Sequence, residues 1–190
     1  MTNALWYTAR GTGVVTLVLL SIVVALGIAT RSARPLFGLP RFGVVWVHRS
    51  AGLLALVFLT IHVITMLLDP YAPLRLLDVL LPFAGPYRSF WLGLGAIAAE
   101  LLVAVLVTSL LRQRIGYRVW RFVHWAAYPS WPVAVAHGLG TGTDNGTVWL
   151  WLITGCCVAL VLACVCWRRS DGFTTRPRVT HRTEQLAGIR

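Results

Sequence analysis

The stretch VVWVHRSAGLLALVFLTIHVITML, residues 44–67, decides the fold of this chain, because it is apolar, long enough to cross a bilayer and carries two histidines. About 20 apolar residues span a hydrocarbon core of about 30 Å as a helix. His48 and His62 are 14 residues apart, which corresponds to roughly 20 Å along a helix axis and returns the side chain to within about 40° of its starting direction. The sequence therefore predicts a membrane helix with one imidazole toward each side of the bilayer.

Four further stretches of roughly 18 to 22 residues are apolar enough to cross a bilayer: 13–30, 90–111, 119–138 and 147–167. The chain of 190 residues is 57% hydrophobic and 12% charged, whereas a soluble domain carries about 25% charged residues. Because lipid offers no hydrogen bonds to an open backbone, helices are the expected form of these spans. We therefore predict an all-α integral membrane helical bundle with about five transmembrane helices.

The placement of arginine predicts the orientation of the bundle. All 17 basic residues are arginine, and 14 of them lie around residues 31–49, around residues 112–121, or after Trp167. Cytoplasmic loops are enriched in such residues, so we expect a multi-pass cell-membrane protein with its amino terminus outside and its carboxyl terminus in the cytoplasm. Arg10, Arg75 and Arg88 then lie on the outer side. The membrane domain is expected over residues 1–168, followed by a basic, flexible cytoplasmic tail over residues 169–190.

The formal charge of +11 would be typical of a nucleic-acid-binding protein if the chain were soluble. Here the arginines lie in short loops beside apolar spans, so we predict the lipid bilayer as a partner and no nucleic acid. One alternative concerns residues 1–30, which could form a signal peptide cleaved near Ala29. Only one arginine precedes its apolar run, which favours a retained first helix.

The span 119–138 carries a second pair, His124 and His137, which are 13 residues apart. Since this span and residues 44–67 run in the same direction, His48 and His124 are expected near the cytoplasmic face, and the other two histidines near the outer face. Two imidazoles at one depth are typical of bis-histidine ligation of a low-spin haem. The four histidines therefore predict two stacked haems.

The interval of 13 residues needs a further condition. On a straight helix the second side chain would point about 140° away from the first. Pro129 and Pro132 lie between the two histidines, and proline interrupts the regular hydrogen bonds of a helix. We predict that this interruption turns His137 back toward the span 44–67.

Other residues have both a functional and a structural interpretation. Arg49, Arg118 and Arg121 lie close enough to the cytoplasmic face to pair with haem propionates, or they serve only to set the topology. Trp131 lies in depth between the two haems, where it either bridges the electron path or fills the core. Glu100 is the one carboxylate within a span, and it either takes up protons or forms a structural hydrogen bond.

Two other functions remain open on these residues alone. Histidines inside a membrane also line paths for protons or metal ions, so the chain could be a histidine-lined transporter. Such a path usually places carboxylates beside the imidazoles. This sequence has only Glu100 within a span, so it argues against a transporter. The chain could also be a haem-free membrane anchor for a partner enzyme.

The four histidines with their two intervals resemble the ferric reductase-like transmembrane domain family. The resemblance extends to further residues, namely Gly116-Tyr117-Arg118, Trp120-Arg121, His124-Trp125, Tyr128, Trp131-Pro132 and His137-Gly138, and covers about residues 13–167. It implies a helical bundle that passes electrons across the membrane through two haems b. His48 and His124 would ligate the inner haem, and His62 and His137 the outer haem.

The chain departs from the family pattern in two ways. Many relatives have six helices, whereas five are counted here. Some relatives continue into a flavin and nicotinamide domain, whereas this chain stops after its short basic tail. The resemblance therefore implies the membrane cytochrome subunit of an oxidoreductase. A separate flavoprotein or a quinol would donate the electrons. An acceptor at the outer face, which could be a second protein, would receive them.

Overall fold

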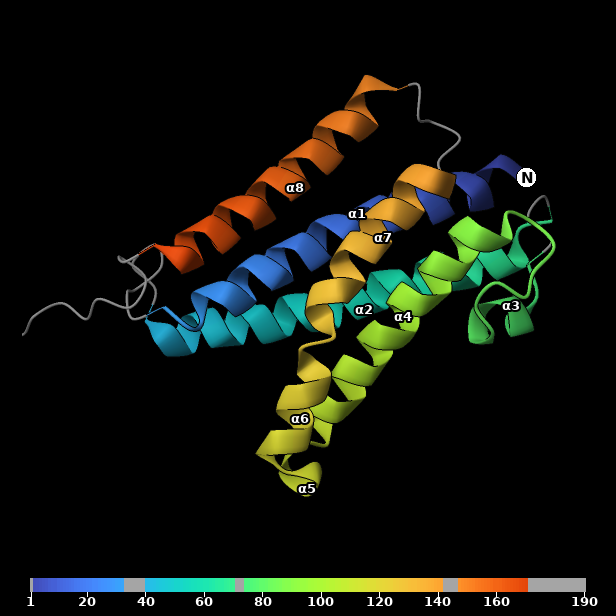
Figure 1. Cartoon of the computed structure of the whole chain (residues 1–190). Coiled ribbons are helices and arrows are strands. Elements are labelled where there is room, and N and C mark those ends of the chain that lie inside the picture. The colour runs from blue at the N-terminus through green and yellow to red at the C-terminus, as the bar shows by residue number, and fades with distance from the viewer. Residues whose placement is uncertain (1, 33–39, 71–73, 142–146, 171–190) are drawn as a thin grey trace, which may run out of the picture.

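The computed structural model describes residues 2–32, 40–70, 74–141 and 147–170, and this part of the chain is built from helices without strands (Figure 1). The long helices are α1 (Thr2–Ala29), α2 (Arg41–Leu68), α4 (Ser89–Leu110) and α8 (Val148–Arg169). The shorter ones are α3 (Leu76–Leu80), α5 (Arg112–Ile115), α6 (Tyr117–His124) and α7 (Ala127–Thr141). The predicted all-α class is confirmed.

Within the described residues, the four long helices are each long and apolar enough to cross a membrane. They correspond to four of the predicted spans, and the chain is a multi-pass membrane protein. The fifth predicted span, 119–138, differs, because it is divided between α6 and α7. The predicted tail lies outside the described residues, except for Arg169, which ends α8, and Ser170.

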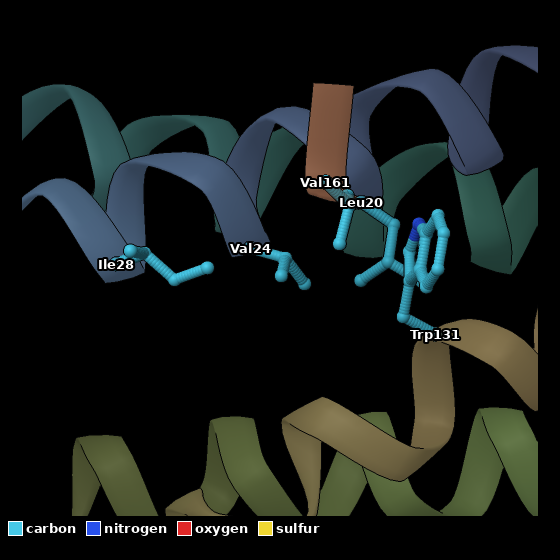
Figure 2. Packing of buried hydrophobic residues seen from close by; sticks show 5 residues of the cluster. All are labelled: Leu20, Val24, Ile28, Trp131 and Val161. Carbon is cyan, nitrogen blue, oxygen red and sulfur yellow. The ribbon is translucent and has the colours of Figure 1, made fainter. Parts of the chain in front are cut away.

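Helix α1 lies at the centre of the bundle and packs against α2, α7 and α8 (Figure 1). Its side chains Leu20, Val24 and Ile28 form a buried cluster with Trp131 of α7 and Val161 of α8 (Figure 2). Helices α4 and α7 also pack against each other. Helices α2 and α7 thus each pack against both α1 and α4.

Hydroxyl groups explain how α1 can begin at Thr2, well before residue 13. The hydroxyls of Thr8, Thr12, Thr16 and Ser21 each donate a hydrogen bond of 2.7 Å to the backbone carbonyl four residues earlier. A hydroxyl paired in this way needs no water, so it is tolerated in an apolar environment. The polar residues therefore do not end the helix.

The chain between His124 and His137 is interrupted, as predicted. The interruption lies at Trp125 and Ala126, ahead of both prolines. Pro129 has no N–H to donate to the carbonyl of Trp125, four residues earlier, and its ring crowds that carbonyl. Pro132 lies inside α7, which continues through it. The break therefore begins one turn before the first proline.

The segment between α2 and α4 covers residues 69–88. Its described part contains only the five-residue helix α3, which packs against α4. The apolar side chains of this segment are exposed, namely Leu76, Leu77, Leu80 and Leu81. This exposure fits a segment that meets the membrane interface.

Candidate haem-binding site

The structure brings the four histidines together in the two predicted pairs. The ring centroids of His48 on α2 and His124 at the end of α6 lie 6.3 Å apart. Those of His62 on α2 and His137 on α7 lie 6.4 Å apart. Each pair therefore consists of one imidazole from α2 and one from the α6–α7 segment, at two positions along the bundle.

Backbone carbonyls hold three of the four imidazoles. Nδ1 of His48 donates to the carbonyl of Val23 over 3.0 Å, and Nδ1 of His62 to that of Ala9 over 2.7 Å. Nδ1 of His137 donates to the carbonyl of Trp91 over 2.9 Å. A carbonyl can only accept, so Nδ1 carries the proton and Nε2 keeps its lone pair for a metal. Metal-bound histidines usually have this arrangement.

His124 is held differently. Its Nδ1 is buried and has no hydrogen-bond partner in the described part of the chain. The ring instead stacks on Trp120, with centroids 4.8 Å apart and planes inclined by 30°. Trp120 is itself fixed, because its Nε1 donates to Ser109 over 3.1 Å and the guanidinium of Arg112 lies 4.4 Å from its ring centroid. An aromatic contact thus replaces the carbonyl at this histidine.

The pairs fit a metal held between two imidazoles. Two metal–nitrogen bonds of about 2.0–2.1 Å, added to two ring radii of about 1.1 Å, place the centroids about 6.3 Å apart. Among the described residues, no three His, Cys, Asp or Glu side chains gather as a metal site. Two imidazoles are enough for a metal whose other ligands come from a cofactor. In haem, the porphyrin supplies four nitrogen ligands in one plane. The donor set therefore fits haem.

A cavity of about 350 Å³ adjoins the second pair. Its lining includes His62 and His137, and apolar side chains from α1, α2, α4, α7 and α8 make up most of the rest. Protein sites for small molecules and cofactors are typically about 300–1,000 Å³, mainly apolar, with a few polar groups. The size and lining of this cavity are those of a cofactor site.

Two arginines that the sequence did not single out line the same cavity. Arg10 belongs to α1, and Arg88 directly precedes α4. Nη1 of Arg88 also donates to the carbonyls of Gly140 and Thr141 over 3.3 Å, which ties it to the end of α7. The distribution of arginines in the sequence assigned both residues to the predicted outer side of the membrane. It did not indicate that they share a cavity.

The arginines predicted near the first pair are all exposed, namely Arg49, Arg118 and Arg121. No hydrogen bond or ring contact joins them to a histidine within the described residues, and their role stays a prediction. Another arginine, Arg112, lies over the ring of Trp120, which in turn stacks on His124. The sequence placed Arg112 in a basic loop without linking it to the site.

Two further candidates lie outside the cavity lining. Trp131 is buried in the cluster with α1, with 9% of its surface exposed (Figure 2). A hydrogen bond to Ser21 holds it there. This placement favours the packing interpretation. Glu100 is exposed on the same face of α4 as Val103 and Val107. It does not line the cavity around His62 and His137.

Comparison with known protein families matches residues 12–135 to the ferric reductase like transmembrane component family. The match covers more than half of the chain and contains three of the four histidines, while His137 lies two residues beyond it. No curated protein and no solved structure gives a significant match. The family consists of membrane components for electron transfer that generally bind haem. With its membrane helices and its paired histidines, this chain belongs to the ferric reductase-like transmembrane family.

Proposed function

We propose that this chain is a membrane cytochrome that carries electrons across the bilayer through two b-type haems. His48 and His124 would hold one haem, and His62 and His137 the other. The observation that carries the proposal is the repeated geometry of the two pairs, with ring centroids 6.3 and 6.4 Å apart. Membership of a family of haem-binding electron-transfer components supports it.

The position of the ligands on α2 supports a path through the membrane. His48 and His62 are 14 residues apart on one helix, or roughly 20 Å along its axis. This distance is a large part of a hydrocarbon core of about 30 Å. Since α2 contributes one ligand to each pair, a single helix fixes the separation of the two sites.

The haem irons would supply the redox chemistry, which is the uptake and release of one electron at each site. The residues of the chain bind and orient the haems. Carbonyls of Ala9, Val23 and Trp91 set the tautomer of three ligands. The lining of the cavity around the second pair is mainly apolar.

Arginines would pair with the haem carboxylates, because charge-assisted hydrogen bonds are strong at a membrane boundary. Arg10 and Arg88 are placed for this role in the cavity around His62 and His137. At the other pair, we propose the predicted Arg49, Arg118 and Arg121 together with the nearer Arg112. These charges would also fix the rotation of each haem in its site.

We infer the direction of transport from the arginine distribution. The end of the bundle at which α1 begins would face outward, so His62 and His137 would hold the outer haem. A cytoplasmic flavoprotein or a quinol would donate electrons, and an acceptor at the outer face would receive them. The chain would thus be the membrane subunit of an oxidoreductase, in a family that typically works with separate redox partners.

The test is an absorption spectrum of the purified full-length chain before and after reduction with dithionite, together with a haem-to-protein ratio. We expect a low-spin b-type spectrum and about two haems per chain. Absence of a low-spin haem signal would overturn the proposal. That result would instead favour a histidine-lined transporter or a haem-free anchor.

A further inference from the structure

The three carbonyl-bound histidines share one local pattern. His62 donates to the carbonyl of Ala9, which lies four residues before Gly13. His48 donates to that of Val23, four residues before Gly27. The same spacing recurs in α4, where His137 donates to the carbonyl of Trp91 and residue 95 is Gly95. Each imidazole therefore binds one helical turn before a glycine of a neighbouring helix.

A side chain at any of these glycines would meet the imidazole. A Cβ atom at Gly95 would lie 2.5 Å from Cε1 of His137, and one at Gly13 would lie 3.1 Å from Cε1 and Nδ1 of His62. At Gly27 the distance to Cε1 of His48 would be 3.3 Å. By contrast, a Cβ atom at Gly11 or Gly52 would meet nothing within 4 Å. A close approach to an imidazole is thus found at the three glycines beside the histidines and not at these two.

Helix geometry explains why glycine occupies this position. In an α-helix, the carbonyl of residue i already accepts a hydrogen bond from the N–H of residue i+4. A ring that also donates to this carbonyl must approach beside residue i+4, where a side chain would normally cover the backbone. Glycine leaves this surface open, since it has no Cβ atom.

We propose that Gly13, Gly27 and Gly95 are positioning residues for the haem ligands His62, His48 and His137, because they let each imidazole reach a backbone carbonyl. This inference rests on the proposed haem ligation. It adds a role for these glycines as determinants of ligand orientation and haem potential. None of them touches the metal.

The hydrogen bond has an electronic consequence for the haem. A carbonyl that accepts from Nδ1 fixes the ring and makes the imidazole a stronger donor to the metal. Stronger donation stabilises ferric iron, so loss of the hydrogen bond raises the midpoint potential of that haem. His124 lacks such a partner among the described residues, so its haem depends on a single carbonyl-bound ligand.

The experiment compares single glycine-to-alanine variants of the full-length chain. Gly95→Ala should lose the haem bound by His62 and His137 and keep the other. Gly13→Ala and Gly27→Ala need smaller shifts, so each should keep two haems. Gly13→Ala should then raise the potential of the haem on His62, and Gly27→Ala that of the haem on His48. Haem content and redox titration of each haem are the readouts.

Two variants serve as matched controls. Gly52→Ala lies on α2, four residues after His48, and Gly11→Ala lies on α1, two residues before Gly13. Both replace a helical glycine that has open space around it, so both should keep two haems at wild-type potentials. Alanine favours a helix more than glycine does, so none of the five changes weakens its helix through propensity.

The test is whether each substitution changes only the haem beside the substituted glycine. The inference is overturned if Gly95→Ala keeps both haems at wild-type potentials, or if Gly11→Ala behaves like Gly95→Ala. Partial loss of the haem on His48 from Gly27→Ala, with an unchanged potential in the fraction of that same haem that stays bound, would also overturn it, because the glycine would then only make room for the porphyrin. A wild-type chain without haem would reject the proposed function itself. Two haems in wild type and in every variant, at unchanged potentials, would reject the glycine inference alone.

Discussion

Nε1 of Trp131 donates a hydrogen bond of 2.8 Å to the hydroxyl of Ser21, and this buried contact joins α7 to α1. Along α1, Ser21 lies between Gly13 and Gly27, the glycines beside His62 and His48. The contact therefore lies between the two histidine pairs. Ser21 also donates to the carbonyl of Leu17, so both groups of the pair are satisfied.

Ser21→Ala should destabilise the bundle without changing its haems. The substitution leaves the buried indole N–H of Trp131 unpaired, which costs about 1 kcal/mol. For a chain of this length, that corresponds to a Tm lower by roughly 2–4 °C in thermal unfolding in detergent. Ser130→Ala is the control, because it removes a buried hydroxyl that bonds only within α7. A change of haem potential without a change of Tm would instead assign Trp131 to the electron path.

Replacement of single histidines should remove one haem at a time. His62→Ala and His137→Ala should lose the same haem, and His48→Ala and His124→Ala the other, because each pair shares one site. The haem-to-protein ratio should fall from about two to about one in each variant. His181→Ala is the control at the fifth histidine and should keep both haems. If His62→Ala and His124→Ala removed the same haem, the pairing would be wrong.

The helices and the histidine pairs were predictable for one physical reason. Lipid forces each spanning segment to pair its own backbone groups, so hydropathy alone marks the helices. The bilayer also turns position along a span into depth, which is why His48 could be matched with His124 before any contact was known. The start of α1 was not predictable from hydropathy, because Thr8 and Arg10 interrupt its apolar run. The local hydroxyl bonds that continue the helix appear only in the structure.

The surroundings of the ligands were less accessible to sequence reasoning. Every residue has a carbonyl, so nothing in the sequence marks those of Ala9, Val23 and Trp91 as partners of histidine. Arg10 and Arg88 could be assigned to one side of the membrane, but their shared cavity depends on how α1 and α4 pack. The three glycines beside the histidines are visible in the sequence. Their role could not be predicted, because it depends on which helix lies opposite each glycine, and tertiary structure decides that.

Trp120→Leu should weaken only the haem held by His48 and His124. The ring of His124 stacks on Trp120 and lacks a hydrogen-bond partner for Nδ1 among the described residues, so the stack orients this ligand. Such a contact contributes about 0.5–1.5 kcal/mol, which corresponds to roughly 2- to 12-fold weaker haem binding. Haem retention during dilution in detergent measures this change.

Trp46→Leu is the matched control for that variant. Trp46 lies two residues before His48 and is 70% exposed, so its replacement should leave both haems bound as in wild type. Equal haem loss from the two tryptophan variants would contradict a specific role of the stack. Loss of the haem on His62 and His137 from Trp120→Leu would contradict it as well.

Gly140→Ala should loosen the contact between α4 and α7 and disturb the haem on His137. A Cβ atom at Gly140 would collide with the indole ring of Trp91, whose carbonyl accepts the hydrogen bond from His137. Overpacking of this kind costs about 1–3 kcal/mol, and the better helix propensity of alanine returns about 0.5–1 kcal/mol of it. Tm and haem content should therefore both fall.

Gly155→Ala on α8 is the control for this change, since a Cβ atom there would meet nothing within 4 Å. It should keep both haems and be as stable as wild type or slightly more stable. If Gly140→Ala lowered Tm but left the potential and the amount of the haem on His137 unchanged, Trp91 would pack α4 against α7 without positioning the ligand. The carbonyl of Trp91 couples these two effects, because the residue that packs against Gly140 is also the one that holds His137.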